Sequence, residues 1–356
     1  MAYDRNFLIL SVSIFALVIA SFFLLEPQVQ GDSVSYLEAV NFLEGGIGHF
    51  ENVAHRVITT FGGLWFIIIL SKLSGSLLGT WFAMNAVFYA LSVFVFYKTL
   101  RILFGDRTAL LGSLFFAGNY ALLTFGLNFL MDMGGWFFYI TSIYFLLKYA
   151  KFEERKHLLL ASFFVGIGGL FKEYAFLPII PIAIFIIFKN RKSLVKIIQE
   201  SWLPAILAIT PILTVYLWIF ICFDYTYFDW LAVNGETYVY SSRAIEYIKS
   251  FGSLLNVLGV VFVAGVAVLS RKWNTLDGDT KLFLASTFIS FLPVFIWPAI
   301  TQRVLFVSTP LVIFIGAFAL EKYKEKNHIF MLLFLVYLTL NLMMDSIVLN
   351  FVNLPI

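Results

Sequence analysis

Apolar runs long enough to cross a bilayer recur along the whole chain, and this pattern limits the fold more than any other feature of the sequence. The composition agrees, because 61% of the residues are hydrophobic, 13% are charged and the mean hydropathy is +0.92. No charged or Pro/Ser-rich stretch is long enough to form a separate soluble domain. We therefore expect one integral membrane domain over residues 1–356, with an all-α polytopic fold.

Eleven of these runs are predicted to span the membrane. The first is too long for a signal-peptide core and is not followed by a small-residue cleavage site, so we expect it to stay attached. The predicted spans are Asn6–Leu25, Leu77–Tyr97, Thr108–Leu127, Met133–Leu147, Leu158–Phe171, Tyr174–Phe188, Trp202–Phe223, Leu254–Leu269, Leu282–Trp297, Val304–Leu320 and Ile329–Leu349.

Basic residues give the orientation of these helices, because Lys and Arg accumulate in the cytoplasmic loops of membrane proteins. With the N-terminus inside, 18 of the 24 basic residues fall on the inner face. A further apolar run, Val57–Ser71, is left out of the spanning set, since a crossing there would move the later basic clusters outside. We expect this run to be an interfacial helix in the first outer loop.

Polar side chains from distant parts of the chain then share the outer side. The outer loops 26–76 and 224–250 are the predicted site-forming segments. Between other helices lie Asp132, Lys172, Glu173 and Arg303. A site assembled from these groups would combine a carboxylate base with cations for an anionic substrate group.

Several classes of site are disfavoured. Cys222 is the only cysteine, which excludes an intramolecular disulfide and a thiolate metal cluster. His49 and His55 have no third ligand at metal spacing, so we predict neither a metal nor another cofactor. A net charge of +3 is too small and too scattered to indicate a nucleic-acid partner.

Short motifs in the first half of the chain occur in a recognisable order. Asp32 and Tyr36 follow the first helix, His55-Arg56 opens the interfacial run, YKTLRILFGDR closes the next helix, Asp132 opens the fourth, and GIGGLFKEYAF ends in Lys-Glu. This order resembles the polyprenyl-phosphate-sugar-dependent glycosyltransferases of the GT-C fold. That family includes protein O-mannosyltransferases and lipid A aminoarabinose transferases.

The resemblance implies an inverting transfer of a sugar from a polyprenyl-phosphate donor to a hydroxyl. The acceptor would be a protein, glycan or lipid at the outer face of the cell membrane. In this scheme Asp32 is the catalytic base and Asp132 orients Asp32 or the acceptor, while cations neutralise the lipid phosphate. The implied substrate-binding residues are Tyr36, His55, Arg56, Lys172, Glu173 and Arg303.

Structural alternatives exist for these residues. Ser35 and Glu38 have the spacing of a capping box, so Asp32 could simply precede a helix start. Asp132 could cap the helix that follows it. Lys172 and Arg303 could be solvated interface charges, and the aromatic residues of loop 224–250 could form an interfacial belt. For the whole chain, a polytopic transporter or lipid flippase stays open, as does an inactive GT-C relative.

Overall fold

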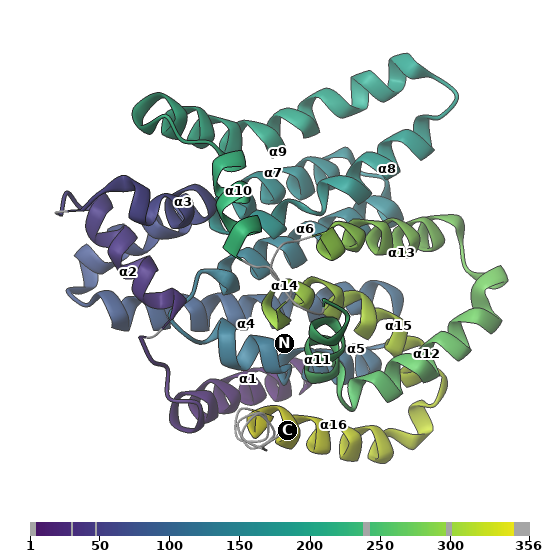
Figure 1. Ribbon diagram of the computed structural model, residues 1–356. Helices are drawn as coiled ribbons and strands as arrows, with labels where there is room; N and C mark the ends of the chain where they lie inside the picture. Colours follow the sequence, from purple (N-terminus) through teal and green to yellow (C-terminus); the bar gives the residue numbers. More distant parts are fainter. Residues whose placement is uncertain (1–4, 30, 47, 238–242, 297–300, 345–356) are drawn as a thin grey trace.

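The computed structural model describes residues 5–29, 31–46, 48–237, 243–296 and 301–344, and its regular structure there is entirely helical (Figure 1). The α-helices are α1 (Arg5–Leu24), α2 (Asp32–Leu43), α3 (Phe50–Ser74), α4 (Leu77–Leu103), α5 (Asp106–Ala117), α6 (Asp132–Phe152), α7 (Arg155–Phe171), α8 (Ile179–Asn190), α9 (Leu194–Phe223), α10 (Tyr227–Thr237), α11 (Arg243–Leu255), α12 (Leu258–Lys272), α13 (Gly278–Phe291), α14 (Gln302–Leu305), α15 (Thr309–Lys322) and α16 (Asn327–Leu342). Short 3₁₀ or π segments are η1 (Leu122–Gly126), η2 (Glu173–Phe176), η3 (Trp273–Thr275), η4 (Leu292–Ile296), η5 (Phe306–Ser308) and η6 (Lys324–Lys326). The predicted all-α class is confirmed.

The helices differ in how much of their surface other helices cover. α5 lies in the middle, with every residue from Thr108 to Ala117 buried. α9 lies at the edge of the bundle, and most of its aliphatic side chains are exposed (Figure 1). Glycines allow the closest helix pairs, because a Cβ on Gly166 of α7 would lie 2.3 Å from a backbone oxygen of α9. Small residues of this kind are typical of helix contacts in membranes.

The described helices account for some of the eleven predicted spans. Among the described residues, six helices are long and apolar enough to cross a membrane, and a seventh is obtained if α11 and α12, bent by 86°, form one span. The total of eleven stays a prediction. Trp297 and residues 345–349, which end two of the predicted spans, lie outside the described residues.

One predicted span, Thr108–Leu127, is interrupted between α5 and η1. Side chains pair the backbone oxygens at this break: the Tyr89 hydroxyl donates to the Ala117 oxygen (2.9 Å), and the Asn341 side-chain amide donates to the Gly118 oxygen (2.8 Å). The side-chain amide of buried Asn119 donates to the Leu254 oxygen (3.2 Å) and the Tyr337 hydroxyl (2.7 Å). The side-chain oxygen of Asn119 accepts from the Ala121 amide at 3.1 Å. The break therefore leaves these buried backbone groups paired, as membrane depth requires.

α3 is longer than the run Val57–Ser71 that predicted it and is kinked at Thr60 (φ −143°, ψ 23°). By length and composition alone, α3 is among the helices that could cross a membrane. Contacts near the start of α3 and just beyond its end show which helix lies beside them. Arg56, near its start, binds Asp32, while Trp81, in the first turns of the following α4, packs edge-on against Tyr36 with ring centroids 6.1 Å apart. The start of α3 and the first turns of α4 therefore both lie against α2, which agrees with an interfacial α3; its position at the membrane interface stays a prediction.

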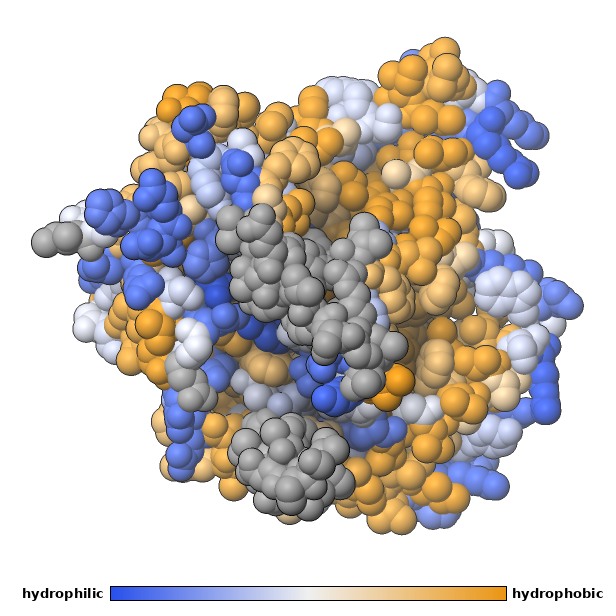
Figure 2. Space-filling model, viewed as in Figure 1, coloured by the Kyte–Doolittle hydropathy of each residue, from blue (hydrophilic) through white to orange (hydrophobic). Residues whose placement is uncertain are grey.

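The loops predicted for the inner face meet at the opposite end of the bundle. The contacts that join them are Lys151 Nζ to Asp277 Oδ2 (2.8 Å), Lys189 Nζ to Glu153 Oε1 (2.7 Å), Arg155 Nε to Glu200 Oε2 (3.4 Å) and the Gly105 amide to Glu321 Oε2 (3.2 Å). Figure 2 shows hydrophilic residues at the left over α2 and α3 and at the right edge, with hydrophobic surface between them. This distribution fits a bundle with two polar ends and an apolar belt.

Single-cysteine labelling tests which end is outside. In a Cys222→Ser background we expect Glu44→Cys, whose side chain is 37% exposed at the end of α2, to react with a membrane-impermeant maleimide in intact cells. Glu325→Cys, in the exposed turn between α15 and α16, should react only after lysis. Labelling of both positions from the same side would contradict the predicted topology.

Candidate active site

The centre of the candidate site is Asp32, the first residue of α2. Gly31 precedes it with a φ of +56°, a left-handed conformation that glycine adopts readily. The two carboxylate oxygens of Asp32 bind different arginines: Oδ1 lies 2.6 Å from Arg56 of α3, and Oδ2 lies 2.5 Å from Arg303 of α14. Arg56 also donates to the Ser35 hydroxyl at 3.2 Å. Three helices separated in sequence therefore converge on one carboxylate.

Arg303 joins Asp32 to the second predicted aspartate. Its other terminal nitrogen lies 2.7 Å from Asp132 Oδ2, at the start of α6. The Asp132 side chain is 1% exposed, and its Oδ1 accepts a hydrogen bond from the Tyr174 hydroxyl at 3.1 Å. Because a buried carboxylate is stable only when paired and hydrogen-bonded, Arg303 and Tyr174 together account for a charge at this depth.

A second group of charged side chains contacts Tyr36, a residue of α2. The Arg56 guanidinium lies over its ring, 4.6 Å from the centroid, and buried Lys172 donates to its hydroxyl at 3.2 Å. Lys172 is also 3.7 Å from Glu173. The predicted polar residues thus form one continuous cluster of three carboxylates and three cations. The carboxylates are Asp32, Asp132 and Glu173, and the cations are Arg56, Lys172 and Arg303.

The environment of Asp32 keeps its carboxylate ionised. Burial by itself would raise the pKa of Asp32, but the positive charges of Arg56, Arg303 and Lys172 outweigh burial. The pKa of Asp32 is therefore held well below its ordinary value of 3.8. In this arrangement Asp32 is a charged but weak base.

Both capping alternatives are wrong. α2 begins at Asp32, so Ser35 lies inside the first turn, where its hydroxyl donates to the Asp32 backbone oxygen at 3.0 Å. α6 begins at Asp132, and no side-chain hydrogen bond caps it. The carboxylates point to arginines from other helices instead, because pairing a buried charge stabilises more than one helix cap does.

The structure brings together all the site residues predicted from the sequence. His55 has the loosest place: its half-buried side chain interacts electrostatically with Asp32, Arg56 and Lys172. Tyr174 was not predicted, although it stands directly after Glu173 in the quoted Lys-Glu motif. Its position in η2, one turn beyond α7, directs its hydroxyl to Asp132, and no sequence pattern indicates that contact.

Tyr174→Phe tests this contact. We expect the variant to lose about 1.5–3 kcal/mol, because a hydrogen bond to a buried carboxylate is stronger than one between neutral groups. Thermal unfolding of the purified variant measures the loss. Tyr144→Phe, in a half-buried ring on α6 away from the cluster, is the control and should unfold like the unsubstituted protein. Equal stability of both variants would mean that the Tyr174 hydroxyl contributes nothing to holding Asp132.

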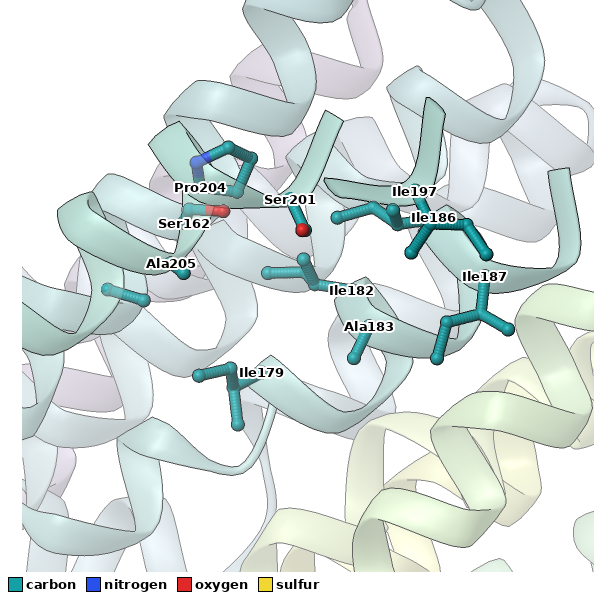
Figure 3. A pocket seen from close by; sticks show the side chains of 11 residues that line it. Ser162, Ile179, Ile182, Ala183, Ile186, Ile187, Ile197, Ser201, Pro204 and Ala205 are labelled. Carbon is teal, nitrogen blue, oxygen red and sulfur yellow. The ribbon is translucent and has the colours of Figure 1, made fainter. Parts of the chain in front are cut away.

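Among the described helices, two cavities are lined almost wholly by apolar side chains. The larger, about 630 Å³, opens between α3 and α4 and is lined mainly by Phe66, Leu70, Met84, Phe88 and Leu91. Phe88 also packs against Phe171, the neighbour of Lys172, with ring centroids 5.6 Å apart. The smaller cavity, about 270 Å³, lies between α7, α8 and α9 with aliphatic side chains pointing into it (Figure 3). None of the predicted site residues lines the smaller cavity.

Comparison with known proteins gives a family match and a fold match. Residues 59–218 match the family model described as dolichyl-phosphate-mannose-protein mannosyltransferase. The matched range contains Asp132, Lys172 and Glu173 but not Asp32, Arg56 or Arg303, which the structure adds to them. No curated protein matches the chain.

Among solved structures, the apo oligosaccharyltransferase of Archaeoglobus fulgidus superposes with a TM-score of 0.59 over 97% of this chain, at 11% identity. The Saccharomyces cerevisiae protein O-mannosyltransferase complex Pmt1-Pmt2, solved with its sugar donor, gives a TM-score of 0.47 over 63% of this chain, at 16% identity. The chain spans 55% and 34% of those two solved chains, respectively. The GT-C fold predicted from the motifs is confirmed.

Proposed function

We propose that this chain, which has the GT-C fold, is a membrane glycosyltransferase that moves a sugar from a polyprenyl-phosphate donor to a hydroxyl acceptor, with inversion, at the outer face of the cell membrane. The observation that carries the proposal is the convergence of Asp32, Asp132 and Arg303 at one polar end of an apolar bundle. A carboxylate beside cations suits a reaction that removes a proton and releases an anion.

The reaction balances with these groups. The acceptor oxygen forms a bond to the anomeric carbon as the bond from that carbon to the phosphate oxygen breaks. The electron pair of the broken bond stays on the lipid phosphate, which leaves as a stable anion. The acceptor proton passes to Asp32, while Arg303 and Lys172 neutralise the phosphate.

The ion pairs of Asp32 add a step to this scheme. Both of its oxygens are bound by arginines, and a base in that state accepts a proton poorly. A lipid phosphate entering between Arg56 and Arg303 would compete for the same guanidinium groups. The donor itself would thereby raise the basicity of Asp32, so that the base becomes effective only when a donor is bound.

The lipid part of the donor also has a place in the proposal. The cavity of about 630 Å³ between α3 and α4 is apolar and lies next to the helix end that carries Lys172. It would take the first isoprene units of the polyprenyl chain while the phosphate lies at the cluster of charges. Burial of apolar chain is worth about 25 cal/mol per Å², so this contact would supply much of the donor affinity.

A donor panel tests the proposal. The purified protein, reconstituted in nanodiscs, is incubated with polyprenyl-phosphate hexoses and pentoses, each labelled in the sugar, and with cell-envelope acceptors. We expect label to move from at least one donor into acceptor, with the anomeric configuration inverted. Product that retains the configuration would contradict the mechanism.

The alternatives predict different results in the same preparation. A flippase would transfer no sugar but would move labelled lipid across the bilayer of sealed proteoliposomes. An inactive relative would bind donor and do neither. Either result would overturn the proposed activity, since only the transferase forms a glycosylated product.

A further inference from the structure

Glu173 is a buried acid that the proposed reaction does not use. Its side chain is 11% exposed, and its Oε2 atom is buried without a hydrogen-bond partner in the described part of the chain. Its ion pair with Lys172 is 3.7 Å long, beyond the range of a good hydrogen bond. A buried carboxylate oxygen left in this way costs free energy, and such a group is typical of a site that awaits a ligand.

Two tyrosines, Tyr216 of α9 and Tyr227 of α10, lie close enough to this carboxylate to be influenced by its charge. Tyr216 stacks on Tyr227 with ring centroids 5.7 Å apart, and Tyr227 contacts Trp230 with centroids 5.0 Å apart. The charge of Glu173 reaches both tyrosine hydroxyls. Burial, followed by the charge of Glu173, raises the pKa of Tyr227, so its hydroxyl stays protonated and available as a donor.

These rings differ from an interfacial aromatic belt. Belt residues place an apolar ring in lipid and a polar tip in water. Here Trp230 is 7% exposed, and the charge of the buried carboxylate of Glu173 influences Tyr216 and Tyr227. By contrast Phe228, their neighbour on α10, is 78% exposed and has the position of a belt residue. The acid and these rings therefore form a separate group, which we call the Glu173 cluster: Glu173, Tyr216, Tyr227 and Trp230.

The Glu173 cluster adjoins the candidate active site. Lys172 lies between them, with its ammonium 3.2 Å from the Tyr36 hydroxyl and 3.7 Å from Glu173. A phosphate bound at Lys172 would therefore have a carboxylate acceptor within reach of whatever group it carries. Sugar rings bind through hydroxyls that donate to carboxylates and through apolar ring faces that stack on aromatic rings.

We propose that the Glu173 cluster binds the sugar ring of the donor, with Glu173 accepting hydrogen bonds from its hydroxyls and the rings of α9 and α10 packing against its apolar face. This inference rests on the proposed function, since it assumes a lipid-phosphate sugar as donor. It makes Glu173 a determinant of which sugar is selected rather than a participant in bond breaking. Sugars lacking the hydroxyls that reach Glu173 would be poor donors.

Equilibrium binding of two labelled lipids tests the proposal without depending on catalysis. One is polyprenyl phosphate and the other is the same lipid carrying a hexose. For Glu173→Gln we expect about 10-fold weaker binding of the hexose-bearing lipid, because the charge that strengthens the hydroxyl hydrogen bonds is lost. Binding of plain polyprenyl phosphate should be no weaker, since Lys172 keeps its charge. Tyr227→Leu should give the same selective loss.

Phe228→Leu is the matched control on the same helix and should bind both lipids normally. An equal loss for both lipids in Glu173→Gln would mean that Glu173 acts through Lys172, and would overturn the proposal. Unchanged binding of the hexose-bearing lipid would overturn it as well. If the unsubstituted protein bound neither lipid, the proposed function itself would fail, and the sugar-binding proposal with it.

Discussion

Arg303→Met is expected to lose about 3–5 kcal/mol of stability and to reduce sugar transfer by at least about 100-fold. The stability loss follows from Asp132, which is 1% exposed and would keep its charge without its main cation. The activity loss is expected because the same guanidinium binds Asp32 and, in the proposed reaction, neutralises the lipid phosphate. Thermal unfolding in detergent and transfer from the active donor measure the two effects separately.

A second substitution distinguishes an unpaired charge from a general packing defect. Adding Asp132→Asn to Arg303→Met removes the stranded carboxylate, so we expect the double variant to regain stability without regaining activity. Strictly additive losses would contradict this account. Lys151→Met is the control, because it breaks an ion pair with Asp277 that is partly solvated, with side chains 22% and 55% exposed, and should cost less than about 1 kcal/mol.

Asp32→Asn is expected to lower the transfer rate by about 10²–10⁴-fold, the usual contribution of a general base. The amide has the shape of the carboxylate but cannot take the acceptor proton. Asp277→Asn removes an ion-paired aspartate at the opposite end of the bundle and should leave transfer unchanged. A rate for Asp32→Asn within about fivefold of the unsubstituted enzyme would exclude Asp32 as the base.

The pH dependence follows from the same residue. Because the pKa of Asp32 lies below 3.8 in the free protein, kcat/KM should show no acid limb from this group above about pH 4. The lowered pKa also means that the ion pairs of Asp32 stabilise the fold above pH 3.8, and that this stability is lost as the pH falls through the lowered folded value. If donor binding draws the arginines away, the acid limb of kcat should lie at higher pH than that of kcat/KM.

That distant polar residues share one end of the bundle could be predicted from the sequence. Basic loops fix the parity of the helices, and that parity alone placed Asp32, Asp132 and Arg303 on one face, where the structure brings them into contact. Shared sidedness does not give partners, however. Which oxygen binds which arginine depends on helix rotation and tilt, which packing determines and charge counts do not encode.

Two other features could not be predicted, because the hydrophobicity of a whole segment hides the effect of a single polar side chain within it. Asn119 lies within an apolar run, so the run predicted an unbroken span, although the helix is interrupted there and the side chain of Asn119 binds Leu254, Tyr337 and the Ala121 amide. From the sequence, Tyr174 could not be distinguished from an ordinary interfacial tyrosine, whereas in the structure η2 directs its hydroxyl to Asp132. Both are single polar side chains whose role depends on a neighbour far along the chain.

The late position of Arg303 in the chain affects when the charged cluster can form during synthesis of the protein. It follows Asp32 by 271 residues and Asp132 by 171, so both aspartates are made long before the cation that joins them. During translation the early helices must enter the bilayer with Asp132 paired only to Tyr174 or hydrated. The nascent chain therefore acquires the complete charged cluster only after α14 has emerged from the ribosome, and a chain truncated before that point would hold both aspartates without the cation that joins them.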